Sequence, residues 1–195
     1  MEEVEEPSLK NQVNKLIFMK YWPVPNSYSN NIPFKGSHGS FWENREDRFH
    51  CGIDIYAPVG SNVISVDDGI VLETGIFTTP KVVKYWNETK FILIKNQDGL
   101  ICKYAELEDV LLKTKDIVKA GQLIGHLGTV LNVEKINFNS PKYIQKIKEK
   151  NTLSMLHFEL YISKPDKSNK YLGGNWFGTN KPKNLLNPDN YLKYK

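Results

Sequence analysis

The sequence contains few cysteines, few histidines and no long apolar run, and each shortage removes a class of protein. Two cysteines, Cys51 and Cys102, cannot build a disulfide-stapled scaffold or a cysteine-rich zinc site. No apolar stretch reaches the roughly 20 residues that cross a bilayer as a helix. Lysine plus arginine is 26 against 22 aspartate plus glutamate, without the concentrated basic stripe of a nucleic-acid binder. The 195 residues therefore indicate one soluble globular domain, with or without an appended segment.

The N-terminus also lacks the apolar core of a secretory signal, because it begins Met-Glu-Glu-Val-Glu-Glu-Pro. Two interpretations stay open, a cytosolic protein or the mature form of an exported one with a replacement methionine. Apolar residues then recur at spacings of three and four between Leu9 and Phe18, which predicts a short amphipathic helix. We therefore expect an N-terminal helical and loop segment over residues 1–33 and one domain over residues 34–195.

The middle of the chain predicts short β-strands. Val, Ile, Phe and Tyr are dense in five segments, and the Asp98-Gly99 pair reads as a hairpin turn between two of them. Such spacing favours a mainly β fold with an antiparallel sheet and short helices. One internal helix is expected over residues 141–150. The expected strands cover residues 63–73, 91–96, 100–105, 123–127 and 156–162.

Four histidines are present, so each can be weighed. His50 and Asp54 are four apart in FHCGIDIYAPVG, a pair that by itself also suits an exposed strand or turn. On a straight strand they would lie about 13 Å apart. Joint binding of one ion therefore requires a bend, which Gly52 would permit.

A third candidate ligand, His157, lies in an alternating stretch. The alternation predicts that Leu156, Phe158 and Leu160 face the core, while His157 and Glu159 share the other face. His, Asp and His from separate segments would leave one coordination position for water, as in catalytic zinc sites. His38 and His126 have no comparable context and are left out of the expected site.

Five segments in this order resemble the lysostaphin-like zinc metalloendopeptidases, which cleave peptide cross-links in bacterial peptidoglycan. They read FHCGIDIYAPVGSNVISVDDGIV, DGLICKYAEL, VKAGQLIGHLG, LHFEL and LLNPDNYL, and the resemblance covers residues 34–192. It implies an open β-sheet groove with one zinc ion on its floor, held by His50, Asp54 and His157. It also implies a location in the periplasm or cell envelope.

The sequence departs from the family at two active-site positions. Met155 and Glu106 stand where the family has the two histidines that flank the metal. Methionine has no proton to exchange. Glu106 has three possible roles, a general base for a zinc-bound water, a fourth ligand that closes the site, or a solvated bystander. We expect the general base, with Tyr104 helping to orient the substrate.

A third departure is an insertion at about residues 129–153, where the family has a short connection. It contains the expected helix, whose residues Tyr143, Ile144 and Ile147 form a narrow apolar stripe. We expect this stripe to dock beside the groove, because so short a helix is marginal alone in water. The insertion would then narrow the groove, cap it or bind a partner, unless it is surface decoration.

The leading prediction is a zinc-dependent endopeptidase that cleaves peptidoglycan cross-links. The first alternative is a catalytically inactive family member that binds peptidoglycan or regulates another protein of the cell envelope. The second is a structural zinc domain in which Glu106 completes the coordination. Cys51 and Cys102 are expected to be buried free thiols, although a disulfide between them stays open if their strands are neighbours.

Overall fold

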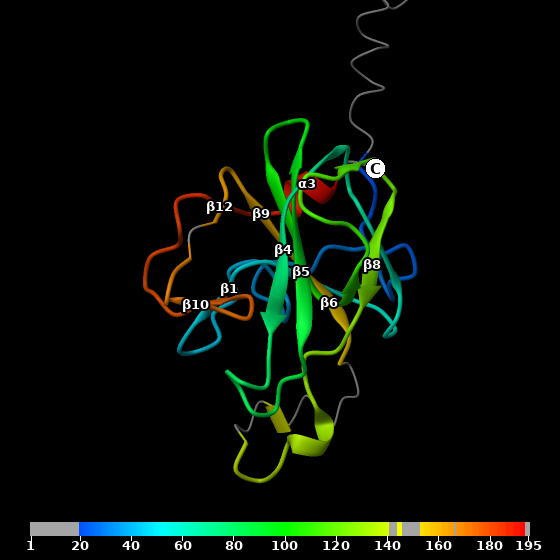
Figure 1. The fold of residues 1–195 in the computed structure, drawn as a ribbon. Helices are drawn as coiled ribbons and strands as arrows, with labels where there is room; N and C mark the ends of the chain where they lie inside the picture. The colour runs from blue at the N-terminus through cyan, green and yellow to red at the C-terminus, as the bar shows by residue number, and fades with distance from the viewer. Residues whose placement is uncertain (1–19, 141–143, 146–152, 166, 194–195) are drawn as a thin grey trace, which may run out of the picture.

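The computed structural model describes residues 20–140, 144–145, 153–165 and 167–193. This part is mostly antiparallel β-sheet, as predicted (Figure 1). A nine-stranded sheet has the central order β12-β9-β6-β5-β4-β7, with β2 paired to β9 and β8 paired to both β3 and β6. Its strands are β2 (Ile53–Tyr56), β3 (Asn62–Ile64), β4 (Gly69–Thr78), β5 (Thr89–Asn96), β6 (Ile101–Val110), β7 (Ile117–Val118), β8 (Leu123–Leu127), β9 (Met155–Tyr161) and β12 (Leu185–Leu186).

A second, three-stranded sheet has the order β1-β11-β10. The described residues also include the 3-10 helix η1 and the short α-helix α3. The bounds are β1 (Phe49–His50), β10 (Tyr171–Leu172), β11 (Asn175–Trp176), η1 (Val133–Lys135) and α3 (Asp189–Leu192). Within the described ranges, no helix combines the length and apolar character that a bilayer crossing requires.

The predicted hairpin turn joins β5 to β6. Gly99 has φ +84°, a conformation that glycine adopts without a steric penalty. The backbone N–H of Asn96 donates to the carbonyl of Leu100, which closes the turn at 2.8 Å. The Asp98-Gly99 prediction is therefore confirmed.

Strand β6 changes partner at Glu106. Before this residue β6 pairs with β9, where Ala105 lies opposite His157. After it β6 pairs with β8, where Leu107 lies opposite Leu127. Glu106 itself has φ +68°, which a residue with a side chain seldom adopts. The bend in β6 thus sets Glu106 where strands β8 and β9 diverge.

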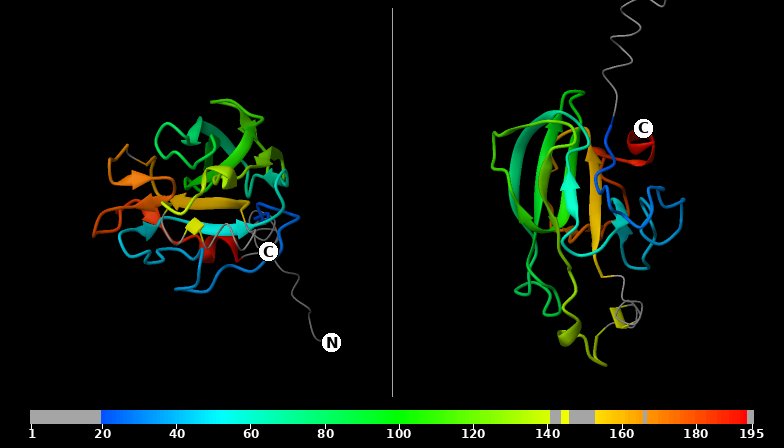
Figure 2. Two further views of the ribbon diagram at one scale, coloured as in Figure 1. Left: turned by 90° about the horizontal axis from the view of Figure 1, so that it is seen from below. Right: turned by 90° about the vertical axis from the view of Figure 1, so that its right-hand side faces the viewer.

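The main hydrophobic core lies against one face of the large sheet. Leu156, Phe158 and Leu160 of β9 all belong to it, as the alternation predicts. Trp22 and Val24 also belong to it, so the described end of the segment assigned to residues 1–33 packs into the domain. In side view, residues 20–40, drawn in blue, lie on the opposite side of β9 from the long strands β4 and β5 (Figure 2).

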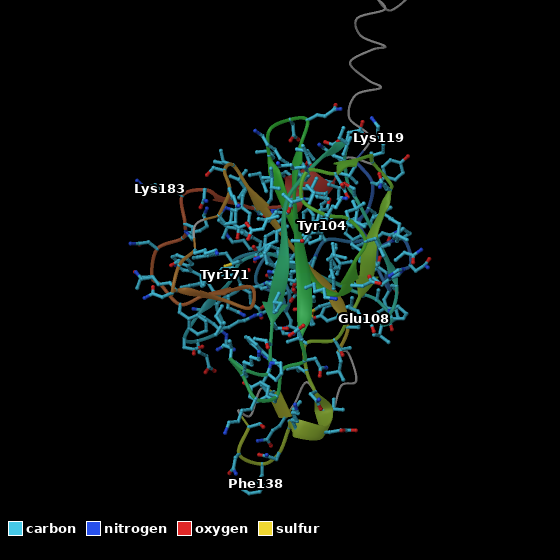
Figure 3. The ribbon with its side chains drawn as sticks, in the orientation of Figure 1. Tyr104, Glu108, Lys119, Phe138, Tyr171 and Lys183 are labelled. Atoms are coloured by element: carbon cyan, nitrogen blue, oxygen red, sulfur yellow. The ribbon has the colours of Figure 1, made fainter. Side chains whose placement is uncertain are left out.

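The first half of the insertion extends below the sheet together with the β4–β5 connection (Figure 1). The two segments pair, since Leu131 bridges to Trp86 and the N–H of Asn87 donates to the carbonyl of Val130 at 2.6 Å. Phe138 marks the far tip and is 86% exposed (Figure 3). The helix expected over residues 141–150 falls mostly outside the described residues, and the N-terminal helix wholly outside them.

Candidate metal centre

The segment from His50 to Asp54 passes from one sheet to the other. His50 ends β1 of the small sheet and Asp54 lies in β2 of the large one. Gly52 forms a bend between them, as the spacing predicts. A Cβ atom at this position would lie 2.3 Å from the carbonyl oxygen of Phe158. Only glycine at position 52 therefore allows the segment between β1 and β2 to run so close to β9.

His50, Asp54 and His157 come together at one point. The Nε2 atom of His50 lies 3.0 Å from the Oδ1 atom of Asp54 and 3.0 Å from the Nδ1 atom of His157. The remaining side of this triangle, from Asp54 to His157, is 3.1 Å. Their side chains are only 1%, 5% and 2% exposed. Among the described residues, these three alone form a group whose potential ligand atoms lie within 4.8 Å of one another.

The chemistry of these atoms fits a metal ion. Two zinc ligands at about 2.0–2.1 Å from the ion cannot lie more than about 4.2 Å apart, and all three separations satisfy this limit. The Nδ1 atom of His50 lies 2.9 Å from the carbonyl oxygen of Ser40, which can only accept. Nδ1 therefore carries the proton, and the Nε2 lone pair faces the other two ligands. Burial lowers the pKa of His50, which keeps the ring neutral as ligation requires.

Glu159 contacts the ring nitrogen of His157 that faces away from the other two ligands. The Nε2 atom of His157 lies 2.8 Å from the Oε1 atom of Glu159, which leaves Nδ1 for the shared point. Burial alone would lower the pKa of His157, but hydrogen bonds to Asp54 and Glu159 outweigh it and raise that pKa to about 9. The metal-free ring is therefore protonated at neutral pH, and a bound metal would displace the proton from Nδ1. Burial likewise opposes ionisation of Glu159, yet the charge of Lys103 and the bond from His157 hold its pKa below the usual range. Such a carboxylate behind a ligand histidine fixes the ring in metal sites.

Asp54 is anchored by a chain of ion pairs that leads to the surface. Its Oδ2 atom lies 3.2 Å from a guanidinium nitrogen of Arg45. The Nε atom of Arg45 lies 3.0 Å from Glu43, whose other oxygen lies 3.2 Å from the Nδ1 atom of His38. His38, 64% exposed, thus ends a polar chain connected to the cluster. Sequence reasoning left it out, because no spacing pattern signals these contacts.

A buried polar network extends from Glu159 away from the cluster. The hydroxyls of Tyr161 and Tyr171 both donate to its carboxylate, and the Nζ atom of Lys103 lies 3.4 Å from it. Lys103 also lies over the ring of Tyr171, at 4.3 Å from its centroid. A cavity of about 950 Å³ opens beside this network, and Lys103, Tyr161, Tyr171 and Trp176 are among its lining residues. The ligand cluster itself does not line that cavity.

Glu106 is buried beside the cluster without joining it. Glu106 is only 8% exposed, and its Oε2 atom has no hydrogen-bond partner among the described residues. Burial, and then the negative charge of Asp54, raise the pKa of Glu106 to about 8, against the positive charges of His157 and Arg45. Its carboxylate lies outside the 4.8 Å group, so the geometry gives the fourth-ligand interpretation no support.

Tyr104 and Met155, two further positions of the expected site, lie in different surroundings. Tyr104 is fully buried in the core, packs edge-on against Phe158, and accepts the N–H of Val66 through its hydroxyl. Tyr104 lies opposite Phe158, and Ala105 lies opposite His157, so Tyr104 is on the other face of the sheet from His157. The structure therefore gives the expected contact of Tyr104 with substrate no support. Met155 is half-buried at the start of β9, next to the cluster.

Cys51 and Cys102 are free and buried, as expected. They belong to different hydrophobic clusters. Burial raises the pKa of both thiols, that of Cys102 to about 12. Neither thiol is therefore reactive at neutral pH.

Comparison with known proteins shows a match to one peptidase family. Residues 48–169 match the model described as peptidase family M23, which covers more than half of the chain. The peptidoglycan DD-endopeptidase ShyC of Vibrio cholerae is 33% identical over 81 residues, 40% of this chain and 16% of that protein. The cell division protein DipM of Caulobacter vibrioides is 28% identical over 131 residues, 66% of this chain and 19% of that protein. The chain thus spans about a fifth or less of these relatives.

The fold is similar to that of lysostaphin. Lysostaphin from Staphylococcus simulans superposes with a TM-score of 0.52 and 21% identity, over 89% of this chain and 55% of that one. The solution structure of lysostaphin gives a TM-score of 0.50 with 22% identity, over 88% and 54%. This likeness bears out the predicted lysostaphin-like antiparallel fold.

Proposed function

The chain belongs to peptidase family M23, and from this membership and the site geometry we propose that it is a zinc-dependent endopeptidase cleaving peptide cross-links of peptidoglycan. The observation that carries the proposal is the meeting of three ligand atoms within 3.1 Å, each side chain anchored by a further partner. The name of the relative ShyC supports peptidoglycan as the substrate. With this substrate, we propose that the protein acts in the periplasm or cell envelope.

His50, Asp54 and His157 would hold the zinc ion. The ion would polarise the carbonyl of the scissile bond and lower the pKa of a bound water to about 7. Three residues would keep the ligand side chains in place, namely Ser40, Arg45 and Glu159. Each contacts the ring nitrogen or carboxylate oxygen that does not face the metal. Buried anchors of this kind favour an ordered site before substrate arrives.

Glu106 would act as the general base in place of the family's histidine. Its carboxylate would take a proton from the attacking water and later give that proton to the leaving amine, so that one water adds across the peptide bond. The pKa of about 8 belongs to the metal-free chain, and a bound zinc ion would lower it, so that Glu106 would be ionised near neutral pH as a general base must be. Its unpartnered Oε2 atom is free to accept that proton.

Glu106→Gln tests this role, because it keeps the shape of the side chain and removes its basicity. Zinc content should be unchanged, and hydrolysis of purified peptidoglycan should fall by roughly 10²–10⁴-fold. Glu108→Gln is the matched control, since Glu108 is exposed on the same strand (Figure 3). Full activity in Glu106→Gln would make Glu106 a bystander, and loss of zinc would make it a ligand.

A second candidate is an inactive family member that binds peptidoglycan or regulates another envelope protein. Two observations favour it, the methionine at position 155 and the relative DipM, which is named for cell division. In this case the protein would bind peptidoglycan and zinc without cleaving a peptide bond. The hydrolysis assay on wild-type protein separates the two candidates.

A further inference from the structure

Strand β2 carries a tyrosine beside the cluster that the mechanism above does not use. Tyr56 follows Asp54 by two residues, at the end of the strand. Ile53 and Ile55 both belong to the hydrophobic core. Because side chains alternate along a strand, Asp54 and Tyr56 share the other face, which is the face of the metal cluster.

The register of β2 against β9 places Tyr56 opposite Met155, which stands where the family has a histidine. Asp54 lies opposite His157, and Tyr56 lies opposite Met155. Residues directly opposite each other have Cβ atoms about 4.5–5.5 Å apart. Along the strand, Tyr56 is about 7 Å from Asp54. The phenol of Tyr56 therefore lies two residues along the strand from the Asp54–His157 pair, opposite Met155, which offers no proton donor.

The hydroxyl of Tyr56 differs from those of the other tyrosines near the site. Tyr104 accepts a backbone N–H, and Tyr161 and Tyr171 both donate to Glu159. The part of the chain that the structure describes supplies no hydrogen bond to the hydroxyl of Tyr56, and its residue is only half-buried. The phenol is thus an unengaged donor on the face of the sheet that carries the metal cluster.

We propose that Tyr56 is a further catalytic residue, whose hydroxyl donates a hydrogen bond to the scissile carbonyl oxygen as negative charge develops there. This role rests on the proposed hydrolase function. When the water oxygen bonds to the carbonyl carbon, an electron pair moves onto the carbonyl oxygen, and a placed donor stabilises it. When the C–N bond breaks, that pair re-forms the carbonyl and the amine leaves with the proton from Glu106. Tyr56 keeps its own proton throughout.

Tyr56→Phe tests the role, because it removes one unengaged oxygen and keeps the ring. On a cross-linked muropeptide dimer, kcat should fall by about 10²–10³-fold, while KM and zinc content stay unchanged. Binding of a phosphinate analogue of the bridge peptide, measured by calorimetry, should weaken by a similar factor. Binding of the uncleaved amide peptide to a Glu106→Gln background should not change. Tyr21→Phe is the control, since Tyr21 packs against Gly121 in another part of the domain.

The outcomes separate the two proposals. An active wild type with Tyr56→Phe unchanged in both kcat and phosphinate affinity would overturn the role of Tyr56 and leave the hydrolase function standing. A wild type that holds zinc but neither cleaves the dimer nor binds the phosphinate would overturn the hydrolase function and, with it, the role of Tyr56.

Discussion

Replacing the carboxyl of Glu106 by an amide should change how the stability of the metal-stripped protein depends on pH. Burial, and then the charge of Asp54, place the pKa of Glu106 at about 8 in the folded chain, against 4.5 for the free group. Between these values the folded chain holds a proton that the unfolded chain has released. Stability must therefore fall as pH rises from about 4.5 to 8.

The size of this effect follows from the same two values. Their difference, at 1.36 kcal/mol for each pKa unit, sets an upper limit of roughly 5 kcal/mol on the stability lost above pH 8. Water that reaches the ionised carboxylate would reduce this loss. Glu106→Gln has no proton to release, so its free energy of unfolding should not carry this slope. The two proteins should be similar near pH 4.5 and diverge up to pH 8, with the variant the more stable.

Urea unfolding followed by tryptophan fluorescence at a series of pH values measures this divergence. Glu108→Gln is again the control, because its exposed side chain should leave the wild-type pH profile unchanged. Added zinc should shrink the slope, since a nearby cation lowers the pKa of a carboxyl. Parallel curves for wild type and Glu106→Gln between pH 5 and 8 would refute the argument that Glu106 is a buried carboxyl coupled to the cluster.

Two further predictions concern His157. Glu159→Gln should weaken zinc affinity by about 10–100-fold in a competition assay with a chelator, because His157 loses the charged partner that orients its ring; unchanged affinity would contradict that role. Gly174→Ala should lower zinc affinity, because the added Cβ atom would lie 2.6 Å from the ring of His157. Gly60→Ala is the control, since Gly60 has nearly the same φ but nothing within 4 Å of the added Cβ atom. The control should lower stability and leave zinc affinity unchanged. Equal zinc affinity in the two alanine variants would show that the ring does not need this space.

Local patterns predicted β5, β6, β8 and β9, because turns and alternation are short-range signals. The segment expected as a strand over residues 63–73 is divided between β3 and β4. The Asp98-Gly99 turn and the core face of β9 are both confirmed. The change of partner along β6 was not predicted, since a positive φ at Glu106 is imposed by the divergence of two distant strands. The position of Tyr104 on the core-facing side of β6 was not predicted either. Its face depends on the register of β6 against β9, which one sequence does not reveal.

The meeting of His50, Asp54 and His157 was anticipated from motif order, and their binding of zinc stays a prediction. The anchors behind them were missed. Ser40 and Arg45 lie in a loop whose path depends on tertiary packing, and nothing in their spacing marks them. Glu159 had a usable signal, since the alternation already placed it on the same face as His157. A carboxylate two residues from a strand histidine therefore deserved a role in the expected site.

The measurement that tests the central claim most directly is digestion of purified peptidoglycan by one preparation whose zinc content is known. The account predicts one zinc per chain, release of cleaved cross-link peptides, loss of both on chelation and recovery of both when zinc is restored. His157→Ala should retain neither metal nor activity. A protein that holds one zinc per chain and binds peptidoglycan, yet releases no cleaved peptide at any pH between 5 and 9, would contradict the claim that it is an endopeptidase.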